Sequence, residues 1–336
     1  MQQIYTPKQN YKVLVHTITY NQAKYITDTL DGVAMQQTNF PLVHYVIDDC
    51  STDGEQEVIK AWLNGHCDMT KAEYIDLELA NVILVPHKTN TNLTFAIYLL
   101  KRNLWKEPEL KGTLVKPWRD HCEYEALCEG DDYWIDTEKL QRQVEYLDSH
   151  SEVLYSCTRF EILIQNTGEK SLGSNYYYDN PDHASESEFL FTRDDAFTKG
   201  WITKTPTCLY RTYAFDQEWL KQFKYSRDVH MVYSILSHGN GVCHNFISSV
   251  YRKNDGGIFG SMNNSNQYLI NYFVYKELFQ FTGDLVIKNL VEFFYLNILG
   301  QKFYRFPTTL IELKVWIKYL WSIPKIIVNK AFASNR

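Results

Sequence analysis

Three carboxylates stand close together directly after the apolar segment 124–128. They are Glu129, Asp131 and Asp132. Carboxylate oxygens are the hard ligands that Mg²⁺ and Mn²⁺ prefer, so this stretch predicts a divalent-cation site that would in turn bridge the diphosphate of a ligand. The alternative is a solvated acidic turn that caps the following helix, because Asp is common at helix starts.

Acidic residues also stand at two other element boundaries. Asp48 and Asp49 directly follow the apolar segment 42–47, and Asp228 opens a predicted helix. Neighbouring acids repel one another, so such a pair persists most naturally where a cation or a hydrogen-bonding ligand compensates the charge. The three acidic positions therefore indicate a polar ligand site, provided that the fold brings them together.

The elements that must position these acids alternate between strand and helix in the first half of the chain. β-Branched and apolar runs predict strands, and apolar residues at helical spacing predict helices. Predicted strands cover 11–19, 42–47, 81–85 and 124–128, and predicted helices cover 23–37, 55–64, 93–105 and 138–149. The polar stretch 106–123 is predicted to be a loop. This alternation predicts an α/β fold with a mostly parallel sheet and ligand sites at the carboxyl ends of its strands.

The second half continues the α/β pattern and then becomes helical. Predicted strands cover 153–164, 203–210 and 241–252, a predicted helix covers 228–237, and the chain is helical and aromatic from Gln267 onward. We therefore divide the chain into an α/β domain at 1–260, with halves 1–135 and 136–260, and a helical C-terminal appendage at 261–336.

Composition excludes several classes of protein. The 336 residues are 45% hydrophobic and 22% charged, which supplies enough apolar material for a packed core. The net charge of −6 argues against a nucleic-acid binder, which normally carries a basic surface. Seven cysteines without a repeat spacing indicate reduced cytosolic thiols. The polar N-terminus predicts no secretory signal, and no apolar run reaches the ~18 residues of a membrane-spanning helix.

The tail at 308–336 has a polarity pattern of its own. Between Leu310 and Val328, apolar residues that include two tryptophans cover most of a helical projection, and the polar residues form one narrow stripe. The tail carries five basic residues and one acidic residue, a charge of +4. These features predict an amphipathic helix on an anionic membrane surface. The alternative is a helix that packs on the protein's own core or at the interface of a homo-oligomer.

Three motifs occur in a fixed order, each directly after a predicted strand. They are Tyr20-Asn21, Asp48-Asp49-Cys50-Ser51-Thr52-Asp53-Gly54 and Glu129-Gly130-Asp131-Asp132-Tyr133-Trp134. Their combination resembles the family-2 inverting glycosyltransferases of the GT-A fold, over roughly residues 11–257. The resemblance implies a nucleotide-diphospho-sugar transferase fold in which 1–135 binds the nucleotide sugar and 136–260 binds the acceptor.

The resemblance also implies which residues bind the nucleotide. Thr19, Tyr20 and Asn21 would form the turn at the uracil and ribose end of the pocket. Asp49 would accept a hydrogen bond from the base. Asn90 would be a further polar contact of the nucleotide, with helix capping as its alternative.

The metal and the diphosphate have implied partners as well. Asp132 would be the direct ligand of Mn²⁺ or Mg²⁺, and Asp131 would bind the ribose or the metal. Arg252 would neutralise charge on the diphosphate. It would also be the first residue of a flexible loop, 252–257, that closes over the donor as a lid. Many family members have His where this chain has Asn254, which puts a second metal or phosphate contact there in doubt.

On the acceptor side, an inverting transfer needs one general base within hydrogen-bond reach of the attacking hydroxyl. The resemblance assigns this role to Asp228, with an N-cap or a partnership with Arg227 as its alternative. Trp134 and Trp201 would be the ring platforms beside the acceptor sugar.

Taken together, these implications predict a metal-dependent inverting glycosyltransferase. It would move a sugar from a nucleotide-diphosphate donor, a UDP-sugar, to a hydroxyl of a glycan or lipid-linked glycan in the synthesis of surface polysaccharide, lipopolysaccharide or capsule. The expected location is cytoplasmic, on the inner face of the membrane. One alternative is a sugar-1-phosphate nucleotidyltransferase, although no glycine-rich phosphate loop follows 11–19. Another is a non-catalytic nucleotide-sugar-binding subunit, against which the retention of all the acids argues.

Overall fold

The computed structural model describes residues 4–224, 226–254 and 264–302. The chain divides into two compact units. The first comprises residues up to 222 together with 228–254, and the second comprises 223–227 together with the segment after 254. The predicted membrane-surface helix at 308–336 lies outside the described residues, as does the part of the predicted lid after Asn254.

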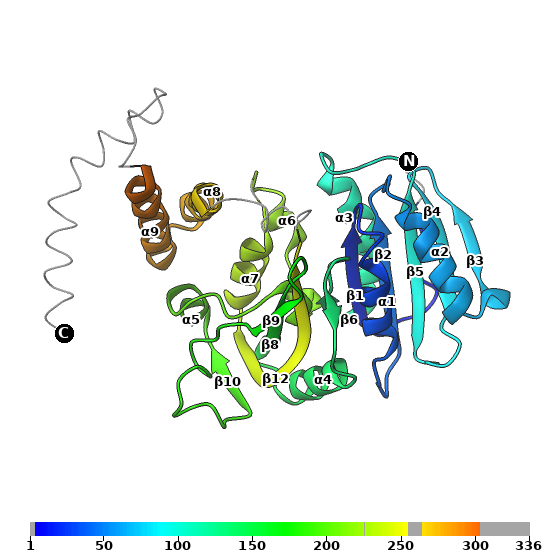
Figure 1. Cartoon of the computed structure of the whole chain (residues 1–336), viewed down its shortest axis with the longest axis horizontal. Helices are drawn as coiled ribbons and strands as arrows, with labels where there is room; N and C mark the ends of the chain where they lie inside the picture. The colour runs from blue at the N-terminus through cyan, green and yellow to red at the C-terminus, as the bar shows by residue number, and fades with distance from the viewer. Residues whose placement is uncertain (1–3, 225, 255–263, 303–336) are drawn as a thin grey trace, which may run out of the picture. The chain divides into compact units, whose positions relative to one another are not determined.

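Four parallel strands form the centre of the first unit's sheet (Figure 1). They are β1 (Tyr11–Thr19), β2 (Leu42–Asp48), β5 (Leu93–Leu100) and β6 (Cys122–Leu127), in the order β6-β1-β2-β5. Thr19 pairs with Asp48, and Asp48 pairs with Leu99. Because these strands share one direction, their carboxyl ends meet at one edge, as the sequence predicts.

The other strands make the sheet mixed rather than purely parallel. On one side of the centre, β4 (Ala80–Pro86) and β3 (Glu73–Asp76) run antiparallel to their neighbours. On the other side, the order outward from β6 is β11, β8, β12 and β10. Their bounds, with those of β7 and β9, are β7 (Tyr133–Trp134), β8 (Val153–Ile164), β9 (Glu169–Leu172), β10 (Glu188–Phe191), β11 (Leu209–Arg211) and β12 (Asn240–Lys253).

Helices cover both faces of the central strands. One core cluster packs apolar side chains of α1 (Ile26–Ala34), α2 (Glu55–His66) and α4 (Lys139–Ser149) against alternate residues of the strands. A second cluster packs α3 (Pro108–Asp120) against the intervening strand residues on the opposite face. Successive side chains of a strand point to opposite faces, so strands buried on both faces read as the continuous apolar runs seen in the sequence.

Three predicted elements are wrong, and two of them concern the region after β4. The third is the strand predicted at 203–210, where 205–207 form a 3₁₀ turn and only 209–211 form a strand. Residues 93–100 form strand β5 rather than a helix, because the run Leu-Thr-Phe-Ala-Ile-Tyr-Leu-Leu is buried on both faces between β2 and β4. Residues 108–120 form helix α3 rather than a loop. Pro108 occupies the first turn, where a missing amide hydrogen is harmless, and Leu114, Val115 and Trp118 form one buried stripe.

Shorter elements connect the second half of the first unit. They are α5 (Arg193–Thr198), the 3₁₀ turns η2 (Thr205–Thr207) and η3 (Thr212–Ala214), α6 (Gln217–Leu220) and α7 (Asp228–Leu236). A further 3₁₀ turn, η1 (Met69–Lys71), lies between α2 and β3 in the first half. Every residue of α7 after Asp228 is buried. This helix is apolar on all sides, which fits a position in the interior of the unit.

The described part of the second unit contains two helices, α8 (Asn264–Thr282) and α9 (Leu285–Lys302). Gly283 separates them with φ at 66°, a conformation that glycine adopts without strain. The preceding segment joins this unit, since the Lys224 amide donates to Glu277 at 2.8 Å and Phe223 packs on Phe281. Among the described helices, none combines the length and the apolar character needed to cross a bilayer.

Candidate active site

The turn after β1 and the turn after β2 are joined through the buried carboxylate of Glu55. This carboxylate accepts hydrogen bonds from the Thr19 hydroxyl, from the Gln22 amide at 2.8 Å and from the Ser51 hydroxyl at 2.8 Å. Burial raises the pKa of Glu55, and the hydrogen bonds oppose this rise. The two predicted donor-binding turns therefore form one rigid frame at the carboxyl edge of the sheet.

Asn21 stabilises the same frame through its backbone and its side chain. Its φ is 55°, in the left-handed region that Asn tolerates better than most residues. Its amide donates to the Ser51 hydroxyl at 2.8 Å, and its side-chain oxygen accepts from the Thr52 amide at 2.7 Å. Tyr20, by contrast, is 46% exposed, and its predicted contact with the nucleotide stays a prediction.

Asp48 and Asp49 are both buried at the end of β2, but their side chains have different partners. Asp49 accepts from the Leu104 amide at 2.6 Å and from the Lys111 ammonium at 2.9 Å. Any hydrogen bond from a nucleobase to Asp49 would therefore share the carboxylate with these partners. Asp48 accepts from the Ser51 amide through Oδ1, and its Oδ2 has no hydrogen-bond partner among the described residues.

The acidic loop after β6 is pressed closely against β1 and α1. A Cβ atom at Gly130 would lie 2.1 Å from the Thr19 hydroxyl and 2.4 Å from the Gln22 side chain, so only glycine fits there. From α1, the buried Thr29 hydroxyl points at three carbonyl oxygens of the loop, at 2.6 Å for Asp132 and 3.1 Å for Gly130. These contacts fix the backbone that carries the acids.

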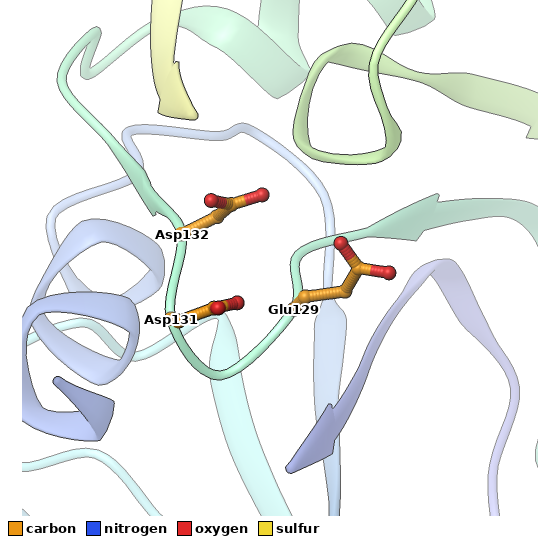
Figure 2. Close-up of side chains that lie close together, drawn as sticks. All are labelled: Glu129, Asp131 and Asp132. Carbon is orange, nitrogen blue, oxygen red and sulfur yellow. The ribbon is translucent and has the colours of Figure 1, made fainter. Parts of the chain in front are cut away.

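Glu129, Asp131 and Asp132 each offer one oxygen atom to a common site (Figure 2). These three atoms lie within 4.8 Å of one another. Asp132 is buried, and its Oδ1 accepts from the Arg252 amide at 2.8 Å. Its Oδ2 is buried and has no hydrogen-bond partner among the described residues. A buried acceptor without a donor is costly unless a cation binds it, so the donor set fits a hard divalent cation.

The electrostatics of the loop support the same interpretation. Burial, together with repulsion from Asp131 and Glu129, raises the pKa of Asp132 well above its usual range. Glu129 keeps solvent access, but desolvation by the surrounding protein and repulsion from Asp131 raise its pKa to about 7. Mutual repulsion of this kind is relieved when a divalent cation joins the carboxylates.

Asp228 is the first residue of α7, and its Oδ1 accepts a hydrogen bond from the backbone amide of the next residue, Val229, at 2.9 Å. The charge of Asp228 contributes to the raised pKa of Glu129 and to that of Tyr251. Tyr251 also responds to the charges of Asp131 and Asp132. The charges of Asp228 and of the acidic loop therefore act on common groups, although nearly a hundred residues separate them in sequence. The role of Asp228 as the base stays a prediction.

Arg252 supports the acidic loop from β12. Its side chain is almost fully buried, and its cation lies over the rings of Tyr25 at 4.6 Å and Tyr133 at 5.1 Å. The guanidinium donates to the Asp131 carbonyl at 2.7 Å and also contacts Gln165 and Asp28. In this arrangement Arg252 positions the loop through groups of the chain itself. Its neighbour Asn254 donates to Asp131 Oδ2 at 2.8 Å.

Asn90 lies at the wrong edge of the sheet for the predicted nucleotide contact. Strand β4 is antiparallel to β5, so the turn that follows it lies beside Leu93, which pairs with the amino end of β2. The Asn90 amide donates to the carbonyls of Ala34 at 3.1 Å and Gln36 at 2.8 Å. It therefore caps the end of α1, which is the capping alternative stated above.

Of the two predicted sugar platforms, Trp134 is wrong. Its side chain is only 2% exposed, its indole donates to the Pro206 carbonyl at 2.7 Å, and the Lys139 ammonium lies 4.4 Å from its ring centre. A ring enclosed on its faces cannot stack on a sugar. Trp201 is partly exposed and packs edge-on against Phe197, and its role as a platform for the acceptor sugar stays a prediction.

Sequence reasoning missed several residues at this edge. Lys111 and Leu104 contact Asp49 because β5 and α3 bring them there. From the η2 turn, Thr205 donates to Glu129 at 2.8 Å, and Lys204 lies 4.8 Å from the ring centre of Tyr251. No local signal marks these residues, because each contact joins segments distant in sequence.

Comparison with known proteins identifies the segment that carries the first two motifs. Residues 14–81 match the family model described as Glycosyl transferase family 2. This segment is therefore similar to the family 2 glycosyltransferases. Uncharacterized proteins of Mycobacterium tuberculosis and Mycobacterium bovis are 36% identical over 136 residues, which is 40% of this chain. The match spans only 31% of the length of those relatives.

The fold of the chain agrees with solved structures. TarS 1-349 of S. aureus, in complex with UDP-GlcNAc, superposes with a TM-score of 0.56 at 18% identity, covering 91% of this chain and 79% of that chain. TarS 1-349 alone gives a TM-score of 0.53 at 16% identity, covering 91% of this chain and 78% of that one. At this identity the likeness shows the fold, which is the GT-A arrangement predicted from the sequence.

Proposed function

We propose that this chain is a metal-dependent inverting glycosyltransferase that takes its sugar from a UDP-sugar and delivers it to a hydroxyl of a glycan or lipid-linked glycan. The observation that carries the proposal is the acidic loop. Asp132 keeps a buried oxygen without a partner among the described residues, beside Asp131 and Glu129. A bound divalent cation would satisfy this oxygen, which would otherwise be a buried acceptor without a donor.

Glu129, Asp131 and Asp132 would hold Mn²⁺ or Mg²⁺ at the carboxyl edge of the sheet. A cation bound there supplies charge neutralisation for the diphosphate of the donor. The frame of Thr19, Asn21 and Glu55 would bind the nucleoside, with the exposed Tyr20 beside it. That TarS is known in complex with UDP-GlcNAc supports a nucleotide-sugar donor for this fold.

Asp228 would act as the general base. Its carboxylate accepts the proton of the acceptor hydroxyl while the hydroxyl oxygen forms a bond to the anomeric carbon. The bond from that carbon to the diphosphate breaks, and the nucleoside diphosphate leaves with the electron pair. Attack from the face opposite the leaving group inverts the anomeric centre. The charge of Asp228 acting on Glu129 supports a position across the acidic loop.

The test is a donor-hydrolysis and transfer assay over UDP-glucose, UDP-galactose and UDP-GlcNAc, with Mn²⁺ or with EDTA. We expect EDTA to abolish turnover of the wild-type chain. Asp132→Asn should lose metal-dependent donor binding, whereas Asp228→Asn should keep donor binding and lose transfer. Each substitution nearly preserves side-chain size. Full transfer by both variants would overturn the site assignment.

A further inference from the structure

A lysine is the cationic residue that faces the acidic loop from the η2 side. Lys204 directly precedes the η2 turn, and the next residue, Thr205, donates to Glu129 Oε2 at 2.8 Å. The Lys204 ammonium lies 4.8 Å from the ring centre of Tyr251. The residue after Tyr251 is Arg252, whose amide binds Asp132 Oδ1. Lys204 thus lies between two residues, Thr205 and Tyr251, whose own segments contact the acidic loop.

The backbone on both sides of Lys204 is fixed. Its carbonyl accepts from the Thr207 amide at 2.9 Å, and its own amide donates to the Thr207 hydroxyl at 3.3 Å. The Thr207 hydroxyl is further bonded to the Lys204 carbonyl at 2.7 Å. The lysine stem therefore leaves from a closed turn rather than from a loose surface loop, and its charge is directed along the Tyr251 ring.

The charge of Lys204 acts on the carboxylates themselves. It lowers the pKa of both Glu129 and Asp132, against the larger effect of burial. Arg252 cannot take this role, because its guanidinium is bonded to Asp131, Gln165 and Asp28 and lies between two tyrosine rings. The Lys204 side chain is only partly buried.

We propose that Lys204 is a second cationic group of the donor site, which competes with the divalent cation in the free protein and pairs with the diphosphate once the donor is bound. Like charges repel, so the ammonium weakens the binding of a cation to the carboxylates in the absence of nucleotide. A diphosphate between the two cations reverses this effect, because both then contact anionic oxygen. Lys204 would thus couple metal binding to nucleotide binding. The pairing of Lys204 with a diphosphate rests on the proposed function. Its competition with a divalent cation rests on the acidic loop.

The experiment measures Mn²⁺ binding and UDP binding by calorimetry on the full chain. Lys204→Met keeps the length of the side chain and removes its charge, and Lys204→Arg keeps a charge. Lys199→Met is the matched control, since Lys199 pairs with Asp195 at 2.7 Å and is half exposed. All three variants are compared with the wild-type chain by circular dichroism to establish that they fold.

We expect Lys204→Met to bind Mn²⁺ alone about 3- to 10-fold more tightly than the wild type, because a nearby positive charge is gone. In saturating Mn²⁺ it should bind UDP about tenfold more weakly, as for the loss of one charged contact. Lys204→Arg should stay near the wild type in both measurements, and Lys199→Met should match it.

The inference fails if Lys204→Met matches Lys199→Met in both affinities, or if its Mn²⁺ and UDP affinities change in the same direction. A wild-type chain that binds no Mn²⁺ would refute this inference and the metal-dependent function together. A wild type that shows the expected Mn²⁺ and UDP responses but transfers no sugar would refute only the proposed function.

Discussion

Replacing Thr29 by valine tests whether α1 holds the acidic loop in place. The Thr29 hydroxyl is fully buried and lies 2.6 Å from the Asp132 carbonyl, with the Gly130 carbonyl at 3.1 Å and that of Glu129 at 3.3 Å. Valine has nearly the same shape, so the change removes the hydrogen bond without opening a cavity. The carbonyls of the buried Gly130 and Asp132 then lose this donor, whereas the Glu129 carbonyl still accepts from the Asp132 amide at 3.0 Å.

The magnitude follows from the cost of an unsatisfied buried acceptor, about 1–3 kcal/mol in the free energy of unfolding. For a chain of this size, that loss lowers the melting temperature by roughly 2–4 °C per kcal/mol. The same carbonyls belong to the residues that would hold the metal. Loss of a group that orients metal ligands costs about 10- to 100-fold in metal affinity, so Mn²⁺ binding should weaken by that factor.

The assays are urea unfolding followed by fluorescence and calorimetric titration with Mn²⁺. Thr113→Val is the matched control, since the Thr113 hydroxyl donates to the Leu110 carbonyl at 2.7 Å on α3, on the opposite face of the sheet. It should change stability slightly and leave Mn²⁺ binding unchanged. If Thr29→Val and Thr113→Val bind Mn²⁺ with equal affinity, the reasoning that α1 positions the acids is refuted.

Three further predictions concern the frame around the site. Lys111→Met leaves the buried Asp49 without its cation and should lower the free energy of unfolding, measured by urea titration, by about 3 kcal/mol. Lys116→Met removes an exposed ion pair on the same helix and should lower it by less than about 1 kcal/mol. Equal losses in the two variants would contradict the burial argument. Gly130→Ala forces a methyl group onto side chains at the end of β1 and should lower stability by about 1–3 kcal/mol and weaken Mn²⁺ binding, and an unchanged melting curve would count against the close contact. Burial, with a smaller effect of a neighbouring histidine, lowers the pKa of His44 from 6.5 to about 3. Between pH 6.5 and pH 3, His44 is therefore protonated in the unfolded chain and neutral in the folded chain. The free energy of unfolding should therefore fall as pH drops below about 6.5, by up to about 1.4 kcal/mol per pH unit from this group. His44→Gln should reduce the difference in stability between pH 7 and pH 5 in urea titrations. An unchanged difference would refute the lowered pKa of His44.

The sequence was informative where chemistry and local structure coincide. The motifs after β1, β2 and β6 follow strands that run in one direction, so their meeting at one edge follows from the alternation of strands and helices. The acid loop needed no tertiary information, because Glu129, Asp131 and Asp132 are neighbours in the chain.

Errors arose where pairing partners decide the structure. The segment 93–100 has apolar residues at spacings that suit either a helix or a buried strand, and only its place between β2 and β4 selects the strand. That choice makes β4 antiparallel, which moves Asn90 to the opposite edge. Trp134 was misjudged for a related reason, because burial of its ring depends on η2 and α4 rather than on its neighbours in the motif.

Glu55 has a consequence for how such a site can diversify. The Glu55 carboxylate accepts hydrogen bonds from both the turn after β1 and the turn after β2. The buried carboxylate, rather than the exposed side chains of the turns, therefore holds their backbone in place. Tyr20 stands at that opening and takes no part in these bonds. The side chain at position 20 can thus be exchanged without loosening the two turns, whereas a change at Glu55 would remove the acceptor that both turns share.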